Sequence, residues 1–478
     1  MNKWQKIFAE NQDAISGIFV VIFCSFLALF NLFFGSSLMV FLACISPAIV
    51  ITFFYPRSGI YAVVFLTLVF ERFFSLQSLF LGRQEIKLYP LDMILGAILL
   101  SALIALISRK IKLKMEKMDW LMVGFILLGL IYFIFSFFLS SSELDLAFSS
   151  LKYYSFYPLI YFLILIFIKN KKQIDLLLKF ALVGATTIVL FIISGIVLGQ
   201  GIWSEFTPLS TEGIRTLAFP HGFYIEMAII TLIIWLAFKK NKINSNFYLI
   251  LIILWSIGII GTMMRHIWIA LGLTSIFCLW ILPKLAKKNL LVLGKKIIFL
   301  SILIITLAFF LLTLAPNSKI MHTLSKPIIN IGERVGSLAS TNDESFSWRG
   351  LVWKEGLKEY ATNPIFGIGF SKKIYVENGN YRDLIEVRNI HNSPLIVLIQ
   401  MGIVAIVVFF LIIYESVKKV IKFKNWLSYA LSGLLLNYLI IFLFQPYLET
   451  NLLGIFFWMI LGSIRINQRY EDTGNQQI

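Results

Sequence analysis

Four histidines are the side chains of this sequence best suited to proton transfer, because imidazole titrates near neutral pH. They are His221, His266, His322 and His391. His391 precedes Ser393-Pro394 and an apolar run, and serine followed by proline is typical of the start of a helix, with Ser393 as the expected N-cap. A helix N-terminus disfavours imidazolium, so we predict a neutral His391 that accepts a proton. The simpler interpretation is a histidine that caps or anchors a helix end.

Two lone arginines are candidates for binding an anion. Arg215 lies in segment 199–221, and Arg265 follows the apolar run Gly258–Met264. Guanidinium groups bind phosphate through paired hydrogen bonds and stay charged at any relevant pH. An arginine at the end of an apolar helix also extends its side chain to the membrane surface without binding a ligand. The sequence therefore leaves two interpretations open, a diphosphate site and a membrane anchor.

Charged residues inside apolar runs form a second group of candidates. Glu226 lies about a turn and a half beyond His221, and Glu71-Arg72 lies within a long apolar segment. An unpaired charge inside a bilayer costs on the order of 3 kcal/mol. Each of these charges should therefore pair with an opposite charge or face a polar cavity, and the sequence does not choose between the two. Glu226, His221 and Arg72 are supporting site candidates.

Metal binding has one weak candidate. Glu143-Leu144-Asp145 has a spacing that can hold a divalent cation, but no further carboxylates cluster nearby. The three cysteines (Cys24, Cys44 and Cys278) all lie inside apolar runs, without metal-ligand spacing, and are expected in the core. We predict neither a metal nor a cofactor.

The elements that position these residues are transmembrane helices. The chain has 478 residues, of which 59% are hydrophobic, whereas soluble chains rarely exceed about half. A span needs about 20 apolar residues. We predict an all-α polytopic membrane protein, one transmembrane domain over residues 1–478, with about fourteen helices. They lie near 14–34, 37–55, 59–80, 90–108, 120–140, 154–168, 177–198, 222–238, 247–264, 267–283, 297–315, 394–415, 427–444 and 452–466.

The basic residues orient these helices. With the N-terminus inside, 26 of the 42 Lys and Arg fall on cytoplasmic segments, six in short external loops and ten in the single long one. That asymmetry follows the positive-inside rule and predicts that both termini are cytoplasmic. The same distribution accounts for the net charge of +17, so we predict no nucleic-acid partner.

The long external loop, residues 316–393, lies between the predicted helices 11 and 12. Loops of that length are usually functional, and we expect this one to be part of the catalytic region. Ser347–Tyr360 is predicted to form an amphipathic helix that carries Arg349, another supporting candidate, and Gly367–Phe370 a tight turn. Outside this loop, segment 143–153 is predicted to form a short interfacial helix.

Four segments together resemble the O-antigen ligase and O-antigen polymerase superfamily of bacterial membrane glycosyltransferases. In chain order they are the outer-loop arginine with an aromatic-Pro-His stretch (214–222), MMRHIWIALGL (263–273), SWRGLVWKEGLKEYATNPIFGIGF (347–370) and HNSPLIVLIQMGIVAIVVFF (391–410). The last two are specific in combination. The resemblance covers about half of the chain, and Met264 departs from it where the family often has a small polar residue.

The resemblance implies transfer of a saccharide from an undecaprenyl-diphosphate-linked oligosaccharide to a saccharide hydroxyl acceptor, on the outer face of the bacterial inner membrane, with lipid as the surroundings. It assigns His391 to activation of the acceptor hydroxyl, and Arg215 and Arg265 to the donor diphosphate. These groups provide a base and charge stabilisation without a metal. A single displacement would invert the anomeric centre.

Several functions share these features. The leading hypothesis is a polymerase that joins lipid-linked repeat units into O-antigen, capsule or exopolysaccharide, with a chain-length regulator as a candidate partner. A ligase that moves the glycan onto lipid A core is the nearest alternative, and a protein glycosylase is a third. From another class, a lipid-linked oligosaccharide flippase also has about fourteen helices. Cell-shape peptidoglycan polymerases depend on an outer-loop aspartate, and Asp343 and Asp383 lie in no recognisable motif.

Overall fold

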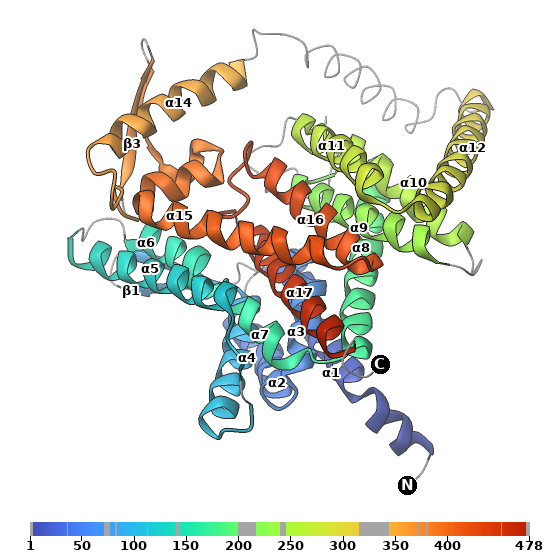
Figure 1. Cartoon of the computed structure of the whole chain (residues 1–478), viewed down its shortest axis with the longest axis horizontal. Coiled ribbons are helices and arrows are strands. Elements are labelled where there is room, and N and C mark those ends of the chain that lie inside the picture. Colours follow the sequence, from blue (N-terminus) through green and yellow to red (C-terminus); the bar gives the residue numbers. More distant parts are fainter. Residues whose placement is uncertain are drawn as a thin grey trace. The chain divides into compact units, whose positions relative to one another are not determined.

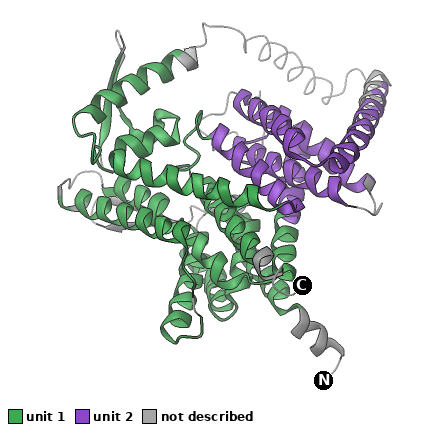
Figure 2. Ribbon diagram, in the orientation of Figure 1, with its two compact units in different colours: residues 1–181, 344–423, 442–478 green, residues 182–343, 424–441 purple. Residues whose placement is uncertain are grey.

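The structure, a computed structural model, describes residues 3–35, 37–70, 77–81, 84–111, 113–139, 144–198, 217–239, 245–314, 344–370, 372–378, 381–450 and 452–474. Helices make up most of it (Figure 1). The chain divides into two compact units (Figure 2). Unit 1 contains residues 1–181, 344–423 and 442–478, and unit 2 contains residues 182–343 and 424–441.

Unit 1 combines apolar helices with two small hairpins. Its elements are α1 (Lys3–Phe34), α2 (Leu38–Phe54), α3 (Pro56–Phe70), β1 (Gln77–Leu81), β2 (Gln84–Leu88), α4 (Pro90–Ile107), α5 (Lys117–Leu139), α6 (Leu144–Leu151), the π-helical turn η1 (Lys152–Phe156), α7 (Leu159–Phe167), α14 (Glu344–Ala361), β3 (Lys373–Asn378), β4 (Tyr381–Glu386), the 3-10 turn η4 (Val387–Ile390), α15 (Ser393–Lys422) and α17 (Leu453–Gly474).

The described elements of unit 2 are all helices, joined by short turns. It contains α9 (Phe219–Phe238), α10 (Ser245–Gly261), α11 (Arg265–Ile281), α12 (Lys284–Leu314) and α16 (Trp426–Ile441). The helix α8 (Lys171–Leu198) begins in unit 1 and continues into unit 2.

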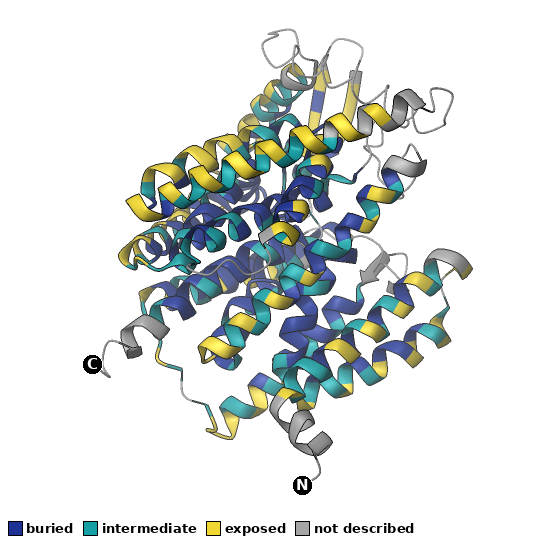
Figure 3. Ribbon diagram, turned by 90° about the vertical axis from the view of Figure 1, so that its right-hand side faces the viewer, coloured by how far each residue is buried: buried dark blue, intermediate teal, exposed yellow. Residues whose placement is uncertain are grey.

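The helices carry the apolar surface of a membrane protein. Seven described helical stretches are long and apolar enough to cross a bilayer. Figure 3 shows exposed positions in yellow along many of the helices, and in two of the seven stretches Phe26 and Leu190 expose 56% and 64% of their surface. Such a surface is stable only against lipid. An all-α membrane protein is therefore confirmed, while the number of fourteen spans stays a prediction.

Each of the fourteen predicted regions contains a helix, but the structure differs from the prediction in two places. The helix predicted to reach residue 80 ends at Phe70, and Gln77–Leu81 is a strand. The short helix predicted over 143–153 is α6, which continues through η1 into α7, and residues 144–167 together are long and apolar enough to be one span. Both differences arise where polar and apolar residues alternate over fewer than three helical turns, too short for periodicity to decide.

A second hairpin interrupts the predicted long loop. Strands β3 and β4 pair antiparallel, with Asn378 opposite Tyr381. Ile374, Val376 and Ile385 alternate with exposed residues and are buried on one face, which is the period of a half-buried strand. The Asn-Gly step that begins at Asn378, the last residue of β3, is a strong hairpin signal in the sequence.

The hairpin, α14, η4 and the start of α15 share a small hydrophobic core. Val352 of α14 packs there with Ile374, Val376, Ile390 and Ile396. The indole of Trp353 donates a hydrogen bond to the carbonyl of Ile390 at 2.8 Å. The predicted amphipathic helix over 347–360 is thus confirmed, and it supports the backbone directly before His391.

Helix α15 breaks at Gly402, where the backbone has φ +73°. The turn after α14 uses the freed groups of the helix: Ile368 N–H donates to Ile399 O at 2.8 Å and Gly369 N–H to Gln400 O at 3.0 Å. Gly367 and Gly369 also have positive φ, which confirms the predicted tight turn. The two segments therefore hold each other through backbone hydrogen bonds.

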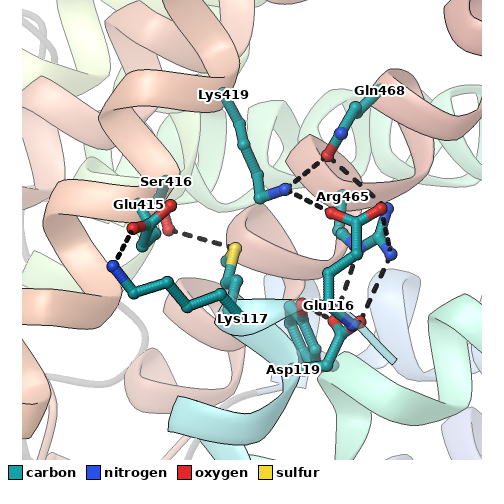
Figure 4. Close-up of polar contacts among 10 residues, drawn as sticks. Glu116, Lys117, Asp119, Glu415, Ser416, Lys419, Arg465 and Gln468 are labelled. Carbon is teal, nitrogen blue, oxygen red and sulfur yellow. Dashed lines mark hydrogen bonds and ion pairs between the residues drawn. The ribbon is translucent and has the colours of Figure 1, made fainter. Parts of the chain in front are cut away.

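A network of charges joins α5, α15 and α17 at the ends that the basic residues predict to be cytoplasmic (Figure 4). Lys419 Nζ lies 2.6 Å from Glu116 Oε2, and Arg465 lies 2.8 Å from Glu116 and 3.3 Å from Asp119. Arg465 and Asp119 are buried. Removing one partner of a buried ion pair leaves an uncompensated charge, so this network fixes how the three helices pack.

The break in α15 yields a test of the fold. A Cβ on Gly402 would collide with the backbone carbonyl of Ile365, and positive φ is itself strained for alanine. Gly402→Ala should lower the free energy of unfolding by at least about 1–3 kcal/mol, measured by thermal unfolding in detergent. Gly350→Ala on α14, where a Cβ meets nothing within 4 Å, is the control. Equal melting temperatures for both variants would contradict this account.

Candidate functional site

His391 occupies an unusual backbone position between η4 and α15. Its φ of 58° and ψ of 37° are left-handed, a conformation that non-glycine residues adopt rarely and that is common at functional sites. The N-cap of α15 is Asn392, whose side chain accepts a hydrogen bond from the Leu395 N–H at 3.0 Å. The sequence predicted Ser393 as the N-cap, one residue after the actual cap. The Ser393 hydroxyl does not cap the helix because it bonds to another partner.

That partner is Glu449, in the turn between α16 and α17. Ser393 Oγ donates to Glu449 Oε2 at 2.6 Å and accepts from the Leu448 N–H at 3.1 Å. The Ser393 N–H donates to the carbonyl of Phe442 at 2.9 Å. Three hydrogen bonds thus attach residues 442–450 to the first turn of α15.

Glu449 itself is a buried carboxyl group. Its second oxygen accepts a hydrogen bond from the hydroxyl of Tyr154 at 2.7 Å. Burial raises the pKa of Glu449 to about 7, against the effect of the hydrogen bonds from Ser393 and Tyr154. The carboxyl group therefore changes its protonation in the physiological range.

The same turn supplies a partner for the imidazole. Nδ1 of His391 lies 2.9 Å from Oε1 of Gln445. With Oε1 as acceptor, Nδ1 carries the proton and Nε2 keeps its lone pair. Burial lowers the pKa of His391, and the positive charge of Arg349 lowers it further, against the hydrogen bond with Gln445. The geometry is that of a neutral imidazole with one nitrogen ready to accept a proton.

Of the predicted site residues, the structure brings Arg349 close enough to His391 to affect its charge. Both belong to unit 1. Arg349 lies one turn before Val352 and Trp353 on α14, which hold the η4 backbone. Arg349 and His391 are 42 positions apart in the chain, and nothing in the sequence indicated that they lie close together.

The other predicted residues lie in unit 2 or outside the described part. Arg265 is the first residue of α11, after Met263 with φ 53°. His221, in the first turn of α9, stacks on Phe191 at 4.8 Å. The turn before Arg265 contacts α9, because a Cβ on Gly222 would collide with the Thr262 side chain. Arg265 and His221 thus lie on neighbouring elements.

Glu226 has an amide as its partner. One carboxyl oxygen accepts a hydrogen bond from Asn437 Nδ2 at 2.7 Å, within unit 2. The other oxygen has no hydrogen-bond partner among the described residues. The sequence predicted that Glu226 pairs with an arginine or faces a polar cavity, whereas the contact in the structure is with the neutral amide of Asn437. Arg215 and Arg72 lie outside the described residues.

Gln445, Glu449 and Tyr154 were not among the site residues predicted from the sequence. A signal for the first two was present: the segment Gln445-Pro446-Tyr447-Leu448-Glu449 places two polar side chains in a short turn between apolar helices. Intramembrane or interfacial carboxyl groups of this kind are functional candidates by default. Tyr154 had no local signal, because it is one of many aromatic residues.

Among the residues that the structure describes, no group of three or more His, Cys, Asp and Glu side chains is arranged to hold a metal ion. Asp145 lies in the first turn of α6, and Glu143 is outside the described residues. The pair proposed from the sequence therefore gains no further ligand from the described part of the fold.

Residues 247–410 match the protein family described as O-Antigen ligase. The matched region contains Arg265, Arg349 and His391 and ends before Gln445 and Glu449. This confirms the resemblance drawn from the sequence. No curated protein matches the chain.

The attachment of the 442–450 turn to α15 can be tested by Ser393→Ala. The change leaves a buried carboxyl oxygen and the Leu448 N–H without their partner, so the free energy of unfolding should fall by about 1–3 kcal/mol. Ser46→Ala removes a hydroxyl that is bonded only to the carbonyl of its own helix at Leu42 and is the control. Thermal unfolding of the two purified variants measures the difference, and an unchanged Ser393→Ala protein would refute the attachment.

Proposed function

We propose that the protein, whose residues 247–410 match the family described as O-Antigen ligase, is a membrane glycosyltransferase acting on undecaprenyl-diphosphate-linked oligosaccharides. In this proposal the protein joins repeat units into O-antigen, capsule or exopolysaccharide. The observation that carries it is His391, half-buried and hydrogen-bonded at Nδ1 to Gln445, an arrangement in which Nε2 is the nitrogen that takes the proton.

The reaction needs one bond formed and one broken. The acceptor hydroxyl oxygen attacks the anomeric carbon of the donor sugar, its proton passes to Nε2 of His391, and the bond to the diphosphate breaks. Undecaprenyl diphosphate leaves with the electron pair, and the anomeric configuration inverts. General-base assistance of this kind contributes about 10²–10⁴-fold to rate.

The leaving diphosphate requires positive charge. Arg215 and Arg265 are proposed to bind it, because guanidinium forks match phosphate oxygens. Arg265 begins α11 directly after the N-cap residue Met264, and the start of this helix is fixed by the Trp268 indole, which donates a hydrogen bond to the carbonyl of Ile259 at 3.1 Å. Arg349 is proposed to keep His391 neutral rather than to bind the donor.

The proposed setting is the bacterial inner membrane, with both termini in the cytoplasm and residues 316–393 outside. The basic residues support this orientation through the positive-inside rule. It puts His391, Gln445 and Glu449 at the outer surface and the Glu116–Lys419–Arg465 network at the inner one. A lipid-linked donor can then approach sideways between helices.

A ligase that transfers the finished glycan to lipid A core is the second candidate, favoured by the description of the matched family. Deleting the gene separates the two. Loss of a polymerase leaves single repeat units on undecaprenyl diphosphate, whereas loss of a ligase leaves polymer on that carrier. A chain-length regulator is a candidate partner of the polymerase only. A flippase would move the lipid-linked oligosaccharide in vesicles without forming a glycosidic bond, and that result would overturn the transferase proposal.

The role of His391 predicts a specific pH dependence. His391→Ala should lower transfer by at least about 10²-fold while donor binding persists. The neutral imidazole is the active form, so activity should fall as pH decreases through the pKa of His391. Since burial and Arg349 lower that pKa from 6.5, the acid limb of kcat/KM should lie below pH 6.5.

The variant Arg349→Gln tests whether the charge of Arg349 lowers the pKa of His391. Without the guanidinium, the pKa of His391 rises and the acid limb should move to higher pH. Arg382→Gln removes an exposed arginine of the β3–β4 hairpin that pairs with Glu377, and should leave the limb in place. An acid limb that stays in place in Arg349→Gln would exclude this role for Arg349.

Arg265 has its own prediction. Arg265→Ala should reduce transfer at least tenfold without loss of folded protein, and Arg265→Lys should recover only part, because lysine keeps the charge and loses the bidentate geometry. The assay is product formation from purified lipid-linked donor, with thermal unfolding as the check on folding. Full activity of Arg265→Ala would remove this residue from the site.

A further inference from the structure

The first part of α12, residues 284–296, is a basic segment that the proposed mechanism does not use. Five of its thirteen residues are lysines and none is acidic. At 1.5 Å per residue, the 31 residues of α12 span about 46 Å, whereas the hydrocarbon core of a bilayer is about 30 Å thick. The long apolar run of the helix begins after Lys296, so the helix extends beyond the core at its basic end.

One side of this segment is attached to α9. Ala286 is only 3% exposed. Asn289, three positions later, donates a hydrogen bond from Nδ2 to the carbonyl of Ala237, near the end of α9, at 2.8 Å. Residues three positions apart lie on the same side of a helix. These contacts fix the rotation of the segment about its axis, and its opposite side is turned away from α9.

The lysines occupy this opposite side. Lys284, Lys288 and Lys295 are four and seven positions apart, which places them on one side of the helix, and all three are exposed. Leu285 and Leu291 lie among them, and each exposes 66% of its surface. A helix whose exposed surface combines lysine with leucine is typical of the boundary between lipid headgroups and acyl chains.

These lysines have no acidic partner in their own unit. The sequence contains no Asp or Glu between Glu226 and Glu333, and Glu226 is the only acidic residue in the part of unit 2 that the structure describes. Its side chain is buried and accepts a hydrogen bond from Asn437. The negative charge that balances the lysines must therefore come from outside the described part of unit 2.

The basic residues at the predicted cytoplasmic ends of unit 1 differ in this respect. Lys419 pairs with Glu116 at 2.6 Å, and Lys117 pairs with Glu415 at 2.8 Å. The positive-inside rule counts basic residues, and acidic residues contribute little to it, so paired lysines satisfy it as well as unpaired ones do. The uncompensated charge of α12 is therefore a separate property of this segment, beyond its role in orientation.

We propose that the basic face of α12, formed by Lys284, Lys288 and Lys295, binds the headgroups of anionic phospholipids in the leaflet predicted to be cytoplasmic. The headgroup phosphates supply the missing negative charge. The acyl chains cover Leu285 and Leu291, which a free phosphate ion would leave in water. Basic clusters next to a membrane span are typical of such binding, and each lysine near an anionic surface contributes about fivefold to it.

The test compares two lipids with the same acyl chains and different headgroup charge. The full-length protein in detergent is titrated with phosphatidylglycerol or with phosphatidylcholine, and native mass spectrometry counts the bound lipids. One variant removes the charge of the basic face through Lys284→Gln, Lys288→Gln and Lys295→Gln. A second variant places arginine at the same three positions and keeps the charge.

The matched control removes three lysines elsewhere. Lys354, Lys358 and Lys372 of unit 1 are exposed, and glutamine at these positions lowers the net charge by the same amount. The wild type, the arginine variant and the control should bind phosphatidylglycerol at least about tenfold more tightly than phosphatidylcholine. In the glutamine variant of α12 this preference should fall by at least about tenfold.

Thermal unfolding in nanodiscs provides the second measurement. Phosphatidylglycerol in a phosphatidylcholine nanodisc should raise the melting temperature of the wild type and the control, and not that of the glutamine variant of α12. The increase should disappear at high salt, because the Debye length falls to about 3 Å at 1 M. Melting temperatures in pure phosphatidylcholine show whether each variant is folded.

Equal affinity of the wild type for the two lipids would overturn the inference. So would an undiminished preference in the glutamine variant of α12, since the lipid would then bind elsewhere, and so would an equal loss in the control. None of these measurements involves sugar transfer, so their outcome is independent of the proposed reaction at His391.

Discussion

The site depends on one buried hydrogen bond, from Ser393 Oγ to Glu449 at 2.6 Å. A carboxyl group in an apolar interior must have donors, and Ser393 and Tyr154 are the donors here. Because Ser393 begins α15, satisfying Glu449 also fixes the turn 442–450 against that helix. Gln445 is then within 2.9 Å of Nδ1 of His391. The need of the buried Glu449 carboxyl group for hydrogen-bond donors thus places Gln445 beside His391 and orients its imidazole.

The backbone supplies the second constraint. His391 has a left-handed conformation just before α15, and Gly402 breaks that helix eleven residues after His391. Between these two points the helix is held by the turn after α14 and by Tyr132, which donates to Met401 O at 2.8 Å. Strained positions persist only where their surroundings determine them. The segment that carries His391 and Gln400 is therefore rigid, as precise positioning of a substrate requires.

The charged and titratable groups around α15 differ between its two ends. Near His391 the balance favours a neutral ring, because burial and Arg349 both oppose imidazolium. At the far end, Lys419 and Glu415 take part in ion pairs with Glu116 and Lys117 of the α5 region. Structural charges are paired at one end, and the titrating groups His391 and Glu449 lie at the other.

What the sequence determined is local: the apolar runs, the amphipathic helix that carries Arg349, the glycine turn at 367–369 and the place of His391 before a helix, each expressed by residues within a few turns of one another. The tertiary structure decided what lies far apart in the chain, such as Tyr154 and Ser393 meeting at Glu449. The capping residue shows the difference. Asn392 and Ser393 are both good N-caps, and only the distant Glu449, which takes the serine hydroxyl, makes Asn392 the cap. Sequence periodicity carries no information about a partner 56 positions away.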